Sequence, residues 1–125
     1  MGYMDLTITG SDYASDAMGA MTKDMVKSLR NTLKEDGNGG GFNTGGVENV
    51  SMILCSVVCG NSDFDYCQTL IDFIAKTVLP KLRKLIVRSD KTMDWSDAGG
   101  DSNKKWHLEA YRGWQKKLEE WLDSQ

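Results

Sequence analysis

Three cysteines and one histidine are the side chains with the strongest potential for chemistry in this 125-residue chain. Cys55 and Cys59 are four residues apart, so on a helix they share one face, and Cys67 with His107 could in principle complete four metal ligands. The spacing differs from the Cys-x-x-Cys knuckle of structural zinc sites, and valines and leucines surround the first two thiols. We therefore expect small core residues here and predict no metal site.

The same Cys–His combination is the only conceivable pair of a thiol nucleophile and its general base in the sequence. A sole histidine without a local motif around it does not predict thiol catalysis. No catalytic residue and no cofactor are therefore predicted. Whether the protein is an enzyme stays open, and we favour a protein without enzymatic activity.

A glycine-rich stretch, GNGGGFNTGG from Gly37 to Gly46, has two interpretations. Glycine at this density disfavours helix and strand, so the stretch is a loop that connects two helices. Alternatively, Asn43, Thr44, Gly45 and Gly46 hold a phosphate or nucleotide, because free backbone N–H groups and the positive end of the next helix attract anions. The Gly-Lys-Ser/Thr ending of a phosphate-binding loop is missing, which favours the connector.

Basic side chains gather on the C-terminal half of the longest apolar-periodic segment, and we take four of them as a candidate partner-binding patch: Lys81, Arg83, Lys84 and Arg88. Cations near a helix C-terminus are favoured by the helix dipole alone, so a solvated face is one interpretation. The alternative is a docking patch for an acidic protein or a nucleic acid. Aromatic residues do not alternate with these charges, as single-strand binding would require.

Composition narrows the function classes. A net charge of -3 and an isoelectric point near 5.1 argue against a protein that coats nucleic acid, so nucleic acid is not an expected partner. Apolar residues make up 40% of the chain, yet no run approaches the ~18 consecutive apolar residues of a membrane span. The N-terminus lacks the features of a secretory signal, and the odd number of cysteines suits reduced thiols. We therefore expect a cytoplasmic protein.

Periodicity predicts an all-α fold, a compact bundle in one domain. The organising segment runs from Ser62 to Arg88, where apolar residues recur at steps of three and four: Phe64, Cys67, Leu70, Ile71, Ile74, Val78, Leu82, Leu85 and Ile86. Pro80 interrupts it, so the helix either kinks or restarts there. The four predicted helices cover residues 12–34, 46–59, 63–88 and 103–123. A short extended arm (1–10) precedes them, the glycine-rich loop (37–46) joins the first two, and a polar connection (89–102) precedes the last.

The other three helices also carry apolar stripes that should face this central segment. The stripe of the first helix includes Met21 and Met25, and that of the second includes Ile53 and Val57. Trp106, Trp114 and Trp121 fall on one side of the last helix, a large apolar load that we expect to be docked. The surplus of Met and Trp also suggests self-association into a homodimer.

The two ends of the chain resemble an uncharacterised family of small bacterial proteins, the domain of unknown function 4259. The similarity is carried by Met1-Gly2, Met4, Ser11-Asp12, Ala14 and Asp16, and by the Trp and Leu spacing from Trp95 to Leu122. Met4 stands where the family has Trp, and Asp5 and Thr7 replace its glycines. The resemblance implies a helical fold and carries no information on activity.

The function that these features favour is a small non-enzymatic binding protein of the inhibitor, adaptor, immunity or anti-defence type. It would act through contact with a protein partner that the sequence does not identify. The alternative is a phosphate or nucleotide binder that uses the glycine-rich loop.

Overall fold

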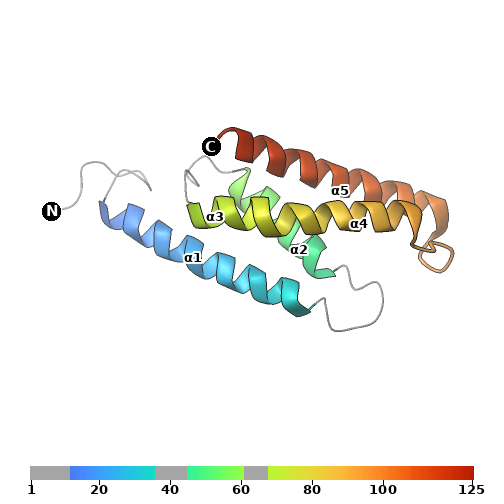
Figure 1. Cartoon of the computed structure of the whole chain (residues 1–125), viewed down its shortest axis with the longest axis horizontal. Helices are drawn as coiled ribbons and strands as arrows, with labels where there is room; N and C mark the ends of the chain where they lie inside the picture. The colour runs from blue at the N-terminus through green and yellow to red at the C-terminus, as the bar shows by residue number, and fades with distance from the viewer. Residues whose placement is uncertain (1–11, 36–44, 61–67) are drawn as a thin grey trace.

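The protein is an all-α bundle (Figure 1). The computed structural model describes residues 12–35, 45–60 and 68–125, without the side chains of residues 12–18, 35 and 45. The predicted extended arm and residues 37–44 of the predicted loop lie outside these ranges. Within them, no helix is both long and apolar enough to cross a membrane.

Four continuous helical rods form the described part of the chain. They are α1 (Asp12–Glu35); α2 (Gly45–Ile53) with the π-helical turn η1 (Leu54–Val58); α3 (Gln68–Phe73), η2 (Ile74–Val78) and α4 (Leu79–Lys91) in one rod; and α5 (Gly100–Asp123). The prediction of four helices is confirmed. The start predicted at residue 63 lies outside the described residues. Gly45, predicted as loop, belongs to α2, and so does Gly46, at which the loop was predicted to end and the helix to begin.

Pro80 neither breaks the central rod nor restarts it. The preceding turn, η2, is π-helical, and the Leu79 N–H donates to the Ile74 carbonyl five residues earlier. Proline lacks an N–H and its ring crowds the carbonyl four residues before it. A widened turn before Pro80 relieves that crowding, so the helix passes through without ending.

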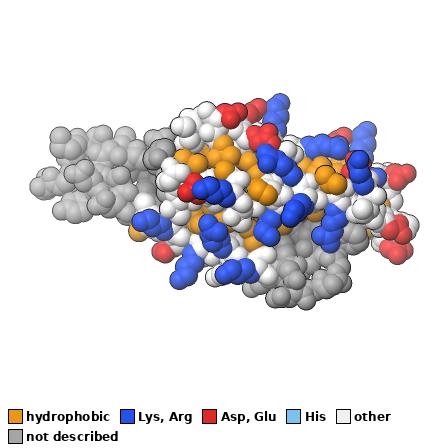
Figure 2. Space-filling view, in the orientation of Figure 1, with side chains coloured by type: hydrophobic (Ala, Val, Ile, Leu, Met, Phe, Trp, Pro, Cys, Tyr) orange, Lys and Arg blue, Asp and Glu red, His pale blue; other side chains and the backbone are white. Residues whose placement is uncertain are grey.

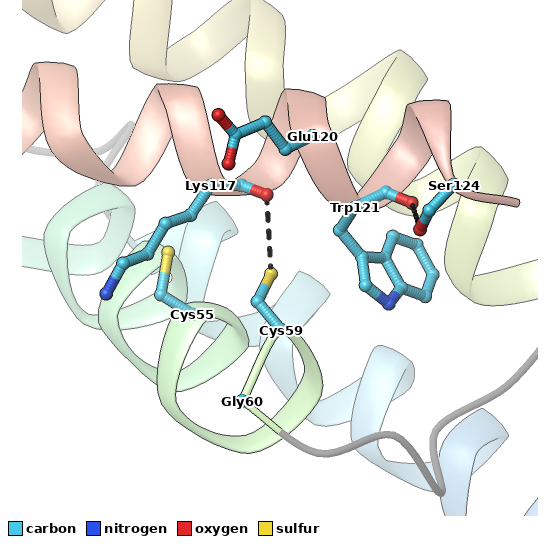
Figure 3. A pocket seen from close by; sticks show the side chains of 7 residues that line it. All are labelled: Cys55, Cys59, Gly60, Lys117, Glu120, Trp121 and Ser124. Atoms are coloured by element: carbon cyan, nitrogen blue, oxygen red, sulfur yellow. Dashed lines mark hydrogen bonds between the residues drawn. The ribbon is translucent and has the colours of Figure 1, made fainter.

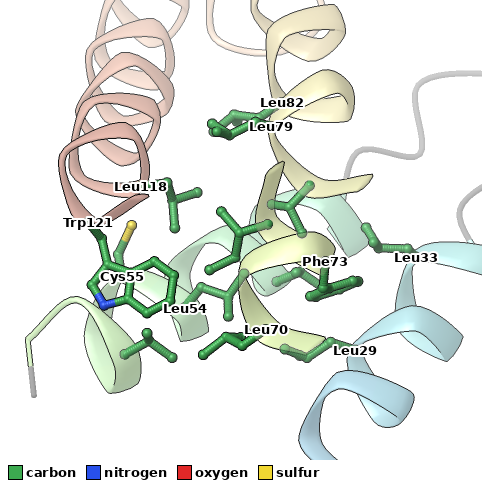
Figure 4. Packing of buried hydrophobic residues seen from close by; sticks show 14 of the residues in the cluster. Leu29, Leu33, Leu54, Cys55, Leu70, Phe73, Leu79, Leu82, Leu118 and Trp121 are labelled. Carbon is green, nitrogen blue, oxygen red and sulfur yellow. The ribbon is translucent and has the colours of Figure 1, made fainter. Parts of the chain in front are cut away.

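The core lies where this central rod meets the other three (Figure 4). Leu70, Ile74, Val78 and Leu82 have no exposed surface, and Leu85 is also buried, which confirms the predicted stripe over its described part. The other helices contribute these buried apolar residues: Val26, Leu29 and Leu33; Val50, Leu54, Cys55 and Val58; Leu108, Tyr111, Leu118 and Trp121. In Figure 4, Phe73 lies on the side of the central rod that faces Leu29 and Leu33 of α1.

Four residues predicted to face the core are exposed instead. Met21 is 65% exposed and Trp106 is 67% exposed, while Ile53 and Val57 are about 40% exposed. In α1 the buried face is formed by Thr22, Val26, Leu29 and Leu33. Near Met21, the buried residue is therefore its neighbour Thr22. Because α2 is apolar on nearly every side, its sequence pattern does not select the face that packs.

The connection between α4 and α5 is shorter than predicted, residues 92–99, and it is anchored by Trp95. This side chain is 6% exposed, and its indole N–H donates to the Ser89 carbonyl at 2.8 Å. Gly99 and Gly100 both have positive φ angles, +97° and +72°, which bring the chain into α5. At Gly99 a Cβ atom would also lie 2.2 Å from the Asn103 side chain, so glycine is required there.

Candidate functional site

A small hollow between α1 and the central rod is surrounded by positive charge. Arg30 and Lys34 of α1 line it together with Thr77 and Lys81, and Leu33 contributes an apolar wall. Its volume is about 130 Å³, so it suits a side chain rather than a large ligand. Three cations that are up to 51 positions apart in sequence thus meet at one place on the surface.

Arg30 is held over the core residue Phe73. The guanidinium carbon lies 4.9 Å from the centre of the Phe73 ring, within the range of a cation–π contact. Phe73 itself is fully buried, whereas Arg30 is exposed. The ring therefore fixes the direction of the Arg30 side chain and leaves its N–H groups available to an anionic partner.

Of the four predicted partner-binding residues, Lys81, Lys84 and Arg88 follow one another at steps of four or fewer along α4, and all are exposed. Arg83 has a different environment, because it pairs with Glu119 of α5 at 3.3 Å. Both partners of this pair are exposed, so its contribution to stability is small. We define the basic face as Arg30, Lys34, Lys81, Lys84 and Arg88.

Figure 2 shows the consequence for the surface. Lys and Arg side chains are spread over the face that carries α1 and the central rod, with hydrophobic side chains and few acidic ones between them. Among the described residues, the ion pairs do not include Arg30, Lys34, Lys81 or Lys84. Like charges that are close together and unpaired raise the energy of the free protein, and this cost is relieved by a negatively charged partner.

The predicted anion site at the glycine-rich loop is only partly described. Asn43 and Thr44 lie outside the described residues, and Gly45 and Gly46 form the first turn of α2. Glu48 occupies the same turn, and its carboxylate accepts a hydrogen bond from the Tyr111 hydroxyl. The positive end of this helix therefore already has a carboxylate near it. The anion-binding hypothesis stays a prediction.

The chemically reactive residues of the sequence are divided between two places. Cys55 and Cys59 lie together beside α5, with the Cys55 thiol 3.7 Å from the Trp114 carbonyl and the Cys59 thiol 3.8 Å from that of Lys117. His107 instead contacts the rings of Trp95, Trp106 and Tyr111. Cys67 is not among the described residues. Within the described ranges, no group of three or more His, Cys, Asp or Glu side chains is placed to hold a metal ion.

Sequence reasoning did not identify Arg30 and Lys34 as part of the site. The signal is present only in combination. Arg30 and Lys34 lie in the C-terminal half of α1, and Lys81 and Lys84 lie in the C-terminal half of the central rod. Which faces meet depends on how the helices pack.

No family model, curated protein or solved structure matches this chain. The resemblance of its two ends to the domain of unknown function 4259 stays a prediction.

Proposed function

We propose that this chain is a binding protein that docks an acidic segment of another protein on its basic face. The observation that carries the proposal is the meeting of Arg30, Lys34 and Lys81 around one hollow. Lys84 and Arg88 extend the positive charge along α4 from that point. A row of cations on two helices matches a run of carboxylates on an extended or helical partner.

An acidic protein fits this face better than a nucleic acid does. Val87 is 56% exposed beside Arg88, and Leu33 lines the hollow, so the charges are mixed with apolar surface. Protein partners bury such apolar surface, whereas a phosphate backbone offers it no counterpart.

The experiment measures binding of a defined acidic polypeptide, poly-L-glutamate, by isothermal titration calorimetry. The double variant Lys81→Glu with Lys84→Glu should weaken binding by on the order of tenfold, since each exposed ion pair contributes roughly 0.2–1 kcal/mol and reversal adds repulsion. Affinity should also fall as salt is added, because the charges are exposed.

The matched control is Lys105→Glu with Lys116→Glu, which makes the same change in net charge on exposed positions of α5. We expect this control to bind nearly as well as the parent. An equal loss in both double variants would mean that binding follows net charge and not the basic face. Tighter binding of duplex DNA than of poly-L-glutamate would contradict the choice of an acidic protein as partner.

A further inference from the structure

A second hollow, of about 310 Å³, lies on another part of the molecule, between the end of the α2–η1 rod and the last turns of α5 (Figure 3). Cys55 and Cys59 form one wall, and Lys117, Glu120 and Trp121 of α5 form another. The hollow is open to solvent. It therefore gives small molecules access to two thiols that are not part of the basic face.

The two thiols differ in their surroundings. Cys55 is 8% exposed and belongs to the core, while Cys59 is partly exposed at the end of η1. Figure 3 shows both sulfur atoms directed toward α5, with the side chain of Lys117 beside Cys55. A reagent that enters the hollow reaches Cys59 first, and Cys55 lies behind it.

The pKa values of the two thiols are shifted in opposite directions. Interaction with the neighbouring Cys59 thiol raises the pKa of Cys55, and burial raises it further. The same interaction lowers the pKa of Cys59, an effect that burial opposes and the Lys117 ammonium group assists. A helix C-terminus disfavours a negative charge, and the Lys117 ammonium group, which lowers the pKa of both thiols, offsets part of that cost. Glu120, the other charged residue that lines the hollow, pairs with Lys116 at 4.0 Å.

We propose that Cys59 and Cys55 form an oxidisable dithiol, in which Cys59 reacts with hydrogen peroxide and Cys55 closes a disulfide with it. In the first step the Cys59 thiolate attacks one peroxide oxygen. The S–O bond forms, the O–O bond breaks, and the leaving hydroxide takes a proton to become water. In the second step the Cys55 sulfur attacks the sulfenic sulfur, and the hydroxyl group leaves as water with the Cys55 proton. Two thiols are oxidised and one peroxide is reduced to two waters.

Helix geometry permits this bond. Cys55 lies in the π-helical turn η1 and Cys59 caps that turn, so the two residues are neighbours on one side of the rod. In a regular α-helix, Cα atoms four residues apart are separated by about 6 Å, which is within the roughly 4.4–6.8 Å found for disulfide-bonded cysteines. Cys59 caps the rod directly before Gly60, so the terminal turn can tighten without breaking a following helix turn. The bond would draw both sulfurs away from the Trp114 and Lys117 carbonyls and weaken the contact with α5.

The test uses the full chain with Cys67→Ser, which leaves only the pair. After hydrogen peroxide treatment, intact mass spectrometry should show the loss of two hydrogen atoms, and dithiothreitol should restore them. With Cys55→Ser added, Cys59 should accumulate sulfenic acid, which dimedone labels. With Cys59→Ser added instead, neither product should form. A parent that gains oxygen atoms without losing hydrogen, or a Cys59→Ser chain that reacts as fast as its parent, would overturn the proposal.

A second measurement keeps both thiols and so does not depend on a cysteine substitution in the core. Lys117→Gln should slow alkylation of Cys59 by iodoacetamide near neutral pH by at least about threefold, because loss of the cation raises the thiol pKa. Lys105→Gln, an exposed lysine of α5 that does not line the hollow, is the control and should react like the parent. Equal rates for the two variants would remove Lys117 from the site. Circular dichroism on each variant establishes that the helices are retained.

Discussion

Replacement of Phe73 by alanine is expected to lower the free energy of unfolding by about 3–5 kcal/mol, the range for large core aromatics. Phe73 has no exposed surface and lies at the end of α3, where the central rod faces α1 (Figure 4). Its loss leaves a cavity next to Leu29 and Leu33 and removes the ring under Arg30. A domain of this size is stable by roughly 5–15 kcal/mol, so the change is a large part of the total.

Urea denaturation followed by circular dichroism measures this change. The control is Phe73→Leu, which keeps most of the apolar volume and should cost less than about 1.5 kcal/mol. If Phe73→Ala unfolded at the urea concentration of the parent, the packing of α1 on the central rod would be wrong. The meeting of Arg30 with Lys81 would then have no structural basis.

Replacement of Trp95 by alanine should be comparably costly, about 3–5 kcal/mol. Trp95 lies in a loop but is 6% exposed, and its indole N–H bonds to the Ser89 carbonyl at 2.8 Å. Trp95→Phe should cost about 1–3 kcal/mol, since a ring remains while that buried carbonyl loses its donor.

Trp106 provides the matched control for this second prediction. It is 67% exposed, so Trp106→Ala should change the stability by no more than about 0.5 kcal/mol. Thermal unfolding by differential scanning calorimetry compares the three variants with the parent. If the two alanine variants were equally destabilised, the order of burial of Trp95 and Trp106 would be contradicted.

The helices could be predicted from the sequence because a step of three or four between apolar residues is a local property. The spacing of Leu70, Ile74, Val78 and Leu82 defines one face without knowledge of its neighbours, and these residues are indeed buried. The passage through Pro80 was left open between a kink and a restart. The outcome is a π-helical turn over Ile74–Val78, which sequence periodicity does not register.

Burial was predicted less well where a helix has more than one apolar side. Ile53 and Val57 belong to a helix that is apolar nearly all round, so the face that meets the core depends on the position of α1 and α5. Trp106 follows helical spacing with Trp114, but its side chain, near the start of α5, is exposed. These exposed residues leave the homodimer hypothesis as a prediction.

The candidate site shows the same limit. Lys81, Lys84 and Arg88 are identifiable from sequence because they are close along one helix. Arg30 and Lys34 join them only through the packing of α1 on the central rod, and Arg83 is directed to Glu119 by the packing of α5. The proximity of Cys55 and Cys59 follows from their spacing, whereas the role of Lys117 requires the position of α5.

The central claim is that cations of α1 and α4 form one binding surface, and nuclear magnetic resonance tests it most directly. In a titration of ¹⁵N-labelled protein with poly-L-glutamate, the amide signals of Arg30 and Lys34 should shift together with those of Lys81, Lys84 and Arg88, with one common dissociation constant. Shifts confined to one of the two helices, or centred on α5, would contradict the account.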